Sequence, residues 1–135
     1  MNFFANFPVT DVDRSKAFFS ALGWTVNEQM TDQNAACFRL QDGLYLMATS
    51  RAFFESLGDG RKQVGDPATT SMAAFAFDFP SRDEVDAFVA KAEAAGARIG
   101  ATDDYGFMYQ RDFEDPDGNQ FAPFWMDPEG PPPAQ

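Results

Sequence analysis

The side chains that could carry chemistry in this chain are carboxylates, tyrosines, arginines and lysines. The 135 residues include no histidine and one cysteine, Cys37. Zinc, iron, copper and nickel sites depend on imidazole, so a site for these metals would have to be built almost wholly from carboxylates. A Ser-His-Asp or Cys-His nucleophile is excluded outright. General acid–base catalysis remains open to Asp, Glu, Lys and Tyr.

The charge balance restricts the partners. Acidic residues outnumber basic ones by 21 to 10, which gives a formal net charge of −11. Such a chain repels phosphate backbones and anionic lipid surfaces, so we expect no nucleic-acid partner and no membrane partner. It attracts cationic ligands. Solubility of a bacterial-type protein is the simpler explanation for most of these charges.

The length and the apolar content favour one folded domain in a reducing compartment. No apolar run reaches the ~18 residues that cross a bilayer. The start, Met1-Asn2-Phe3-Phe4, has neither the basic residues nor the cleavage site of a secretory signal. The lone cysteine cannot form an internal disulfide. We therefore expect a cytoplasmic protein.

The elements that must position these side chains occur in the same order twice: strand, helix, strand, strand, strand. In the first copy the strands are expected at residues 3–9, 25–30, 35–40 and 44–49, with a helix capped by Asp11. In the second copy they are expected at 72–79, 98–102, 106–113 and 120–126, with a helix capped by Ser81. Each copy is too small to build a comfortable core alone.

This repetition predicts an α+β fold in which two βαβββ modules form a curved mixed sheet around a cleft, with the helices on the outer face. One domain covers residues 1–127. Module 1 spans about 1–57, a linker 58–69, module 2 about 70–127 and a proline-rich tail 128–135. A ferredoxin-like α+β sandwich shares the early strand–helix–strand order and is the alternative.

Alternation along the strands indicates which side chains face the cleft. The large apolar residues fall on one face, and a set of mixed size and polarity falls on the other. The mixed set is Phe4, Asn6, Tyr45, Met47, Ala74, Asp78, Ala122 and Phe124. A tight turn at 115–118 would add Phe107, Tyr109 and Arg111 to that side. We take all of these as candidate ligand-binding residues, although the half-wet face of an ordinary antiparallel sheet is an equally good explanation.

Several segments resemble the vicinal oxygen chelate superfamily, which contains glyoxalase I, extradiol dioxygenases, fosfomycin-modifying enzymes and bleomycin-resistance proteins. They are FPVTDVDRS at 7–15, FF at 18–19, LGW at 22–24 and FEDPDGN at 113–119. Together with the repeated order of elements, the resemblance covers about residues 2–127. It implies the fold, and fold by itself does not fix function.

The resemblance also implies where a metal would be bound. Enzymes of the superfamily typically use a His in the first strand and a Glu in the last strand of each copy. The matching positions here are Phe4, Met47, Ala74 and Ala122. None of these side chains offers an oxygen or nitrogen ligand, so we expect a member that lacks the usual metal ligands and uses no cofactor.

These observations predict a metal-independent small-molecule binding protein of the glyoxalase/bleomycin-resistance type, which sequesters a cationic or aromatic compound. The alternative is a glyoxalase- or dioxygenase-like lyase or isomerase, with Tyr109 or Asp78 as the base and Arg111 holding an anionic group. A metal enzyme with displaced ligands and a domain that binds a protein partner through its surface are two further hypotheses. Relatives of this size imply a homodimer.

Overall fold

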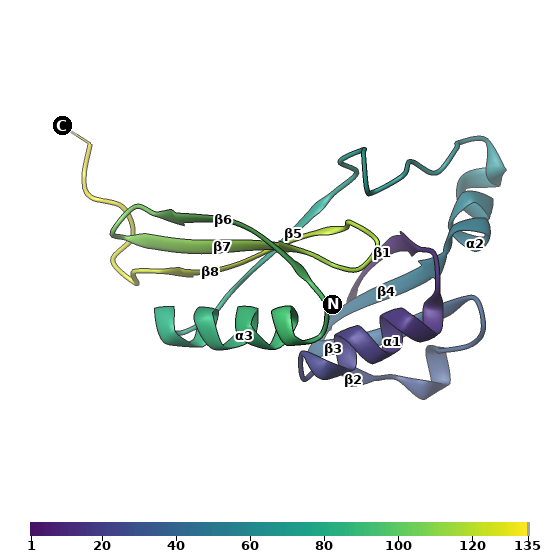
Figure 1. Ribbon diagram of the computed structural model, residues 1–135, viewed down its shortest axis with the longest axis horizontal. Helices are drawn as coiled ribbons and strands as arrows, with labels where there is room; N and C mark the ends of the chain where they lie inside the picture. Colours follow the sequence, from purple (N-terminus) through teal and green to yellow (C-terminus); the bar gives the residue numbers. More distant parts are fainter. Residues whose placement is uncertain (135) are drawn as a thin grey trace. The chain divides into compact units, whose positions relative to one another are not determined.

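The computed structural model describes residues 1–134, which form two compact units, Met1–Asp66 and a second unit that begins at Pro67. In each unit a helix of at least ten residues packs on a four-stranded mixed sheet (Figure 1). The predicted α+β class and the two βαβββ modules are confirmed. None of the helices in residues 1–134 is both long enough and apolar enough to cross a membrane.

The sheet of the first unit has the strand order β1-β4-β3-β2. Its elements are β1 (Phe3–Val9), α1 (Val12–Ala21), β2 (Thr25–Val26), η1 (Glu28–Met30), β3 (Ala35–Gln41), β4 (Leu44–Ser50), α2 (Arg51–Ser56) and η2 (Leu57–Gly60). β1 is parallel to β4, and the other pairs are antiparallel. The strand predicted at 25–30 ends at Val26 because the Asn27 side chain accepts the N–H of Gln29 and starts a 3-10 turn.

Helix α1 covers one face of this sheet. It begins where the Asp11 side chain accepts the N–H of Arg14 at 3.0 Å, which satisfies a donor that would otherwise lack a partner. Phe19 is fully buried, and its ring contacts those of Phe7 and Phe38 at centroid distances of 5.6 and 5.2 Å. The even-numbered side chains of β1 therefore lie on the opposite face.

The sheet of the second unit has the corresponding order, β5-β8-β7-β6. Its elements are β5 (Ala74–Asp78), α3 (Arg82–Ala94), β6 (Arg98–Asp104), β7 (Met108–Glu114) and β8 (Gln120–Met126). β5 is parallel to β8, and β6, β7 and β8 are antiparallel neighbours. Figure 1 shows α3 running beside the strands of this sheet.

Helix α3 packs on the sheet through an apolar stripe. Ser81 caps the helix as predicted, because Glu84 N–H donates to Ser81 Oγ at 3.2 Å, and the Ser81 hydroxyl donates to Glu84 Oε2 at 3.3 Å. Phe88 of α3 is buried, and its ring contacts Phe77 of β5 and Phe113 of β7. These contacts fix which face of each strand lies under the helix.

The turn between β7 and β8 is organised by one buried carboxylate. Asp115 Oδ1 accepts the N–H groups of Asp117, Gly118 and Asn119 at 3.0, 2.9 and 2.8 Å. The Asn119 amide donates to Asp115 Oδ2 at 3.0 Å. Burial raises the pKa of Asp115 to about 6. The turn sets the register of β7 and β8, starting with Glu114 opposite Gln120.

Candidate functional site

A hollow in the second unit lies on the face of its sheet opposite α3, which we call the distal face. Gln110 pairs with Phe124, and Glu114 pairs with Gln120. Asp112 therefore lies opposite Ala122, midway between these two pairs. The side chains of β7 that reach the distal face are the even-numbered ones, because Phe113 contacts α3.

The distal hollow has a volume of about 340 Å³. It is lined by Ala74, Arg98, Ile99, Gly100, Ala101, Gln110, Asp112, Phe113, Glu114, Gln120, Phe121 and Ala122. Small residues create the space, because Ala74, Gly100 and Ala122 carry a methyl group or no side chain. A Cβ added to Gly100 would lie 3.4 Å from the Cβ of Asp112, so β6 and β7 approach closely there. Two of the predicted site residues, Ala74 and Ala122, thus line one hollow.

Acidic side chains predominate on the distal face. Cross-strand pairing brings Asp78 beside Phe124 and Asp103 beside Gln110, and Asp112 and Glu114 follow on β7. Within residues 1–134, Arg98 is the only basic residue on the strands of this face. Its guanidinium lies 3.5 Å from Glu114, and its side chain is 83% exposed. The Gln110 amide donates to Asp112 Oδ1 at 2.9 Å. The face therefore presents more negative charge than its one arginine neutralises.

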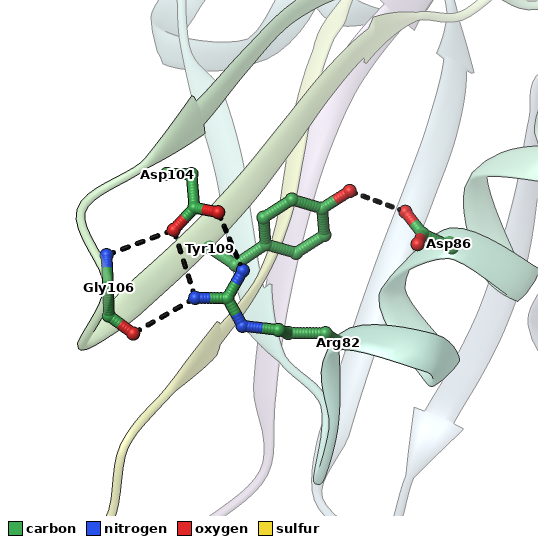
Figure 2. A network of polar contacts seen from close by, with 5 residues as sticks. All are labelled: Arg82, Asp86, Asp104, Gly106 and Tyr109. Carbon is green, nitrogen blue, oxygen red and sulfur yellow. Dashed lines mark hydrogen bonds and ion pairs between the residues drawn. The ribbon is translucent and has the colours of Figure 1, made fainter.

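The opposite face holds a polar network in which the charges are balanced (Figure 2). Arg82 of α3 donates to both carboxylate oxygens of Asp104, at 2.7 and 2.9 Å, and to the carbonyl of Gly106 at 2.9 Å. Its guanidinium also lies 5.0 Å from the ring centre of Tyr109 and 5.1 Å from that of Trp125. The network joins the start of α3 to the β6–β7 hairpin.

Tyr109 and Arg111 belong to this network, so their predicted direction into the hollow is wrong. The Tyr109 hydroxyl donates to Asp86 Oδ1 at 2.7 Å, and Arg111 donates to the same oxygen at 3.0 Å (Figure 2 shows the tyrosine contact). Asp86 is on α3. Both residues are odd-numbered like Phe113, so their side chains lie on the face of β7 that is under the helix. The enzyme hypothesis that used Tyr109 as base and Arg111 as anion holder loses both groups at the hollow.

Hydrogen bonding in this network shifts four pKa values, of which that of Arg82 is raised by its bond to Asp104. The hydrogen bond from Tyr109, followed by that from Arg111, lowers the pKa of Asp86 although partial burial opposes this. The same bond to Asp86 raises the pKa of Tyr109. Arg82 and the Gly106 N–H hold the pKa of Asp104 at about 2. All these groups therefore keep one charge state at neutral pH, which suits a structural role rather than proton transfer.

The candidate residues of the first unit also lie together. Phe4 pairs with Tyr45 and Asn6 with Met47, all on the face opposite α1. The Phe4 and Tyr45 rings stack at a centroid distance of 4.5 Å and an interplanar angle of 9°. The sequence thus placed these four side chains correctly on one face of their own sheet.

The remaining candidates of the second unit are divided. Asp78 and Phe124 pair on the distal face, next to the hollow. Phe107 precedes β7 in the hairpin, where its carbonyl accepts the N–H of Asp127 at 2.7 Å and its ring contacts Tyr105. Sequence reasoning missed Gln110, Asp112, Glu114, Gln120 and Arg98 as lining residues. The available signal was Phe113, an apolar residue near the end of β7. Because side chains alternate along a strand, burying Phe113 under the helix places the even-numbered residues Gln110, Asp112 and Glu114 on the other face.

The chain is similar to one family model and to several proteins of known structure. A family model described as bleomycin resistance protein-like N-terminal matches residues 2–40. Among solved structures, a hypothetical protein from S. aureus superposes with a TM-score of 0.76 at 20% identity, covering 93% of each chain. A glyoxalase/bleomycin resistance protein/dioxygenase family enzyme from Burkholderia phytofirmans gives a TM-score of 0.74 at 20% identity, covering 91% of this chain and 96% of its own. The chain has the vicinal oxygen chelate fold.

Other structures with the vicinal oxygen chelate fold differ in what they do. The lactoylglutathione lyase from Agrobacterium tumefaciens superposes with a TM-score of 0.69 at 16% identity, covering 93% of this chain and 92% of its own. No curated protein sequence matches the chain. The similarities therefore establish the fold, and the site must be interpreted from its own side chains.

The metal that this fold implies does not fit the residues present. The positions that match the usual ligands are Phe4 and Met47 on the first sheet and Ala74 and Ala122 on the distal face. Their side chains provide only carbon and a thioether sulfur, whereas divalent metals in such sites need oxygen or nitrogen donors. Within residues 1–134, no three His, Cys, Asp or Glu side chains are grouped so that they could hold a metal ion.

Proposed function

We propose that this protein binds a small organic molecule in the distal hollow and does so without a metal ion. The observation that carries the proposal is the hollow itself, of about 340 Å³, whose lining includes Ala74 and Ala122 at positions that match the fold's usual metal ligands. The methyl groups at these two positions supply no metal donor and leave space for an organic ligand.

The lining of the hollow supports a binding role. Ligand sites usually combine apolar walls with a few polar groups that fix orientation. Here the apolar side chains are the methyl groups of Ala74 and Ala122, and the polar groups are the amides of Gln110 and Gln120 and the carboxylates of Asp112 and Glu114. With Tyr109 and Arg111 held by Asp86 on the other face, the arrangement favours binding over the lyase or isomerase alternative.

The test begins with a thermal-shift screen of small organic compounds, because a ligand at a hundred times its dissociation constant adds about 2.7 kcal/mol of stability. Ala74→Trp fills the hollow from an exposed position on an edge strand, and Ala122→Trp fills it from within the sheet. Ala90→Trp, on the exposed side of α3, is the matched control. The proposal predicts that the hollow-filling variants lose the shift and the control keeps it. Unchanged binding in folded Ala74→Trp and Ala122→Trp would refute it.

We also propose that the protein forms a homodimer. Phe3 and Leu44 are neighbours in the register of β1 and β4, and they are 57% and 39% exposed. β1 is an edge strand, and apolar side chains on an exposed edge favour association. Sedimentation velocity of the wild type should give twice the monomer mass, and a monomer at high concentration would contradict the proposal.

A further inference from the structure

We propose that the distal hollow selects a cationic ligand, specifically a compound with a protonated amine that pairs with Asp112. This inference rests on the proposed function and names the class of ligand that the same hollow takes. It follows from how charge is distributed between the two faces of the second sheet.

The two faces differ in how their acids are neutralised. On the α3 face, Asp104 is paired with Arg82, and Asp86 is paired with Arg111. On the distal face Arg98 pairs with Glu114, and within residues 1–134 no ion pair is formed by Asp112, which lines the hollow, or by Asp78 and Asp103, which lie elsewhere on the same face. A hollow with an excess of carboxylates favours cations over anions in its field.

Among these carboxylates, Asp112 is the best placed to meet a ligand. It lines the hollow on the central strand β7 and lies opposite Ala122 across the β7–β8 pair. Glu114 already forms an ion pair with Arg98. No ion pair is formed by Asp112 with any residue in the described part of the chain, 1–134.

The neighbours of Asp112 orient its carboxylate so that it can accept a hydrogen bond from a ligand. Gln110 donates to Oδ1 at 2.9 Å, which orients the carboxylate and leaves Oδ2 available to an ammonium group. Because Gly100 has no side chain, β6 lies close to Asp112 and covers one side of its carboxylate. A charge-assisted hydrogen bond in this partly buried position is stronger than a neutral one, which makes the charge of the ligand decisive.

Three probes with the same ring and chain length isolate this charge: tyramine (cation), N-acetyltyramine (neutral) and 3-(4-hydroxyphenyl)propanoate (anion). Each is titrated at millimolar concentrations into ¹⁵N-labelled full-length protein, and the amide shifts of the residues around the hollow are followed. The proposal predicts binding in the order cation, neutral, anion, with about tenfold between the first two. Tyramine binding should also weaken as salt is added.

Two variants assign the effect. Asp112→Asn should abolish the preference for tyramine, whereas Glu93→Gln, which removes the same charge from an exposed position of α3, should leave it unchanged. Equal binding of the three probes, or a preference that survives in Asp112→Asn, would overturn the proposal. So would the absence of shifts around the hollow with tyramine. Equal binding of the three probes at the hollow would leave the proposed function standing. The proposed function fails only if the hollow-filling variants bind every ligand as the wild type does.

Discussion

Replacing Gly118 by alanine tests how tightly the β7–β8 turn is packed. Gly118 has a φ of +103°, and a Cβ added there would lie 2.7 Å from the carbonyl oxygen and 2.9 Å from the carbonyl carbon of Pro67. Both obstacles are backbone atoms, so no side-chain rotation can relieve them. Gly118→Ala therefore combines a left-handed backbone with a steric conflict.

Gly96 provides a matched control in the same unit. Its φ is +107°, but a Cβ added there would meet nothing within 4 Å. The left-handed conformation costs an ordinary residue about 1 kcal/mol, so Gly96→Ala should lose about that amount. Overpacking adds about 2 kcal/mol more, which brings Gly118→Ala to about 3 kcal/mol.

Urea denaturation followed by circular dichroism measures both variants. A separation of about 2 kcal/mol between them corresponds to roughly 6 °C in melting temperature for a chain of this size. The separation should appear in the transition midpoint and not in the slope, because the folded surface is unchanged. Equal destabilisation within about 0.5 kcal/mol would refute the reasoning, since it would mean that the Pro67 segment moves away freely.

Three further substitutions test other parts of the structure. The pKa of Asp115 is raised to about 6, so its ionised form destabilises the fold. The contribution of Asp115 to folding stability is therefore fully present below pH ~4 and is lost as the pH rises through 6. Asp115→Asn should therefore exceed the wild type by up to about 3 kcal/mol at pH 7 and by little at pH 4 in urea denaturation; a deficit that grows with pH would mean that the hydrogen bonds outweigh burial. Ser81→Ala removes the cap of α3 and should cost about 1 kcal/mol by the same measurement, whereas Ser20→Ala on the exposed side of α1 should cost little. Arg82→Ala should lower the melting temperature more than Arg39→Ala, because Arg82 holds a carboxylate, a carbonyl and two rings whereas Arg39 pairs with one exposed carboxylate; equal shifts would show that the network in Figure 2 adds nothing.

Local signals in the sequence were sufficient for most of the secondary structure. Asp11 and Ser81 cap the helices that they were expected to cap, because capping depends on residues three positions apart. The second strand of the first module was predicted too long, since Asn27 competes for the backbone through its side chain. The mixed residues of the first sheet, such as Phe4 and Tyr45, were assigned to the correct face by alternation alone.

The direction of β7 shows where sequence reasoning failed. Phe107, Tyr109 and Arg111 were assigned to the hollow on the assumption of a tight turn at 115–118, yet Tyr109 and Arg111 contact Asp86 on α3. If the alternation of side chains along a strand is assigned one residue out of place, every side chain is assigned to the wrong face. The phase was set by the buried turn at Asp115 and by the packing of Phe113 under the helix, which are tertiary contacts.

The sequence by itself determined the repeated order of elements and the two capped helices, because these depend on residue type and on short spacings. Through the family resemblance it also indicated that the positions of the usual metal ligands carry no oxygen or nitrogen donor. Only the tertiary structure decided that Asp112 and Glu114 share a hollow with Ala74 and Ala122, and that the arginines of α3 and β7 neutralise the other face. Residues from four strands line the hollow, and residues of α3, β6 and β7 form the ion pairs on the other face. Both sets come together only when the register between strands is fixed, and that register depends on contacts between residues far apart in the chain.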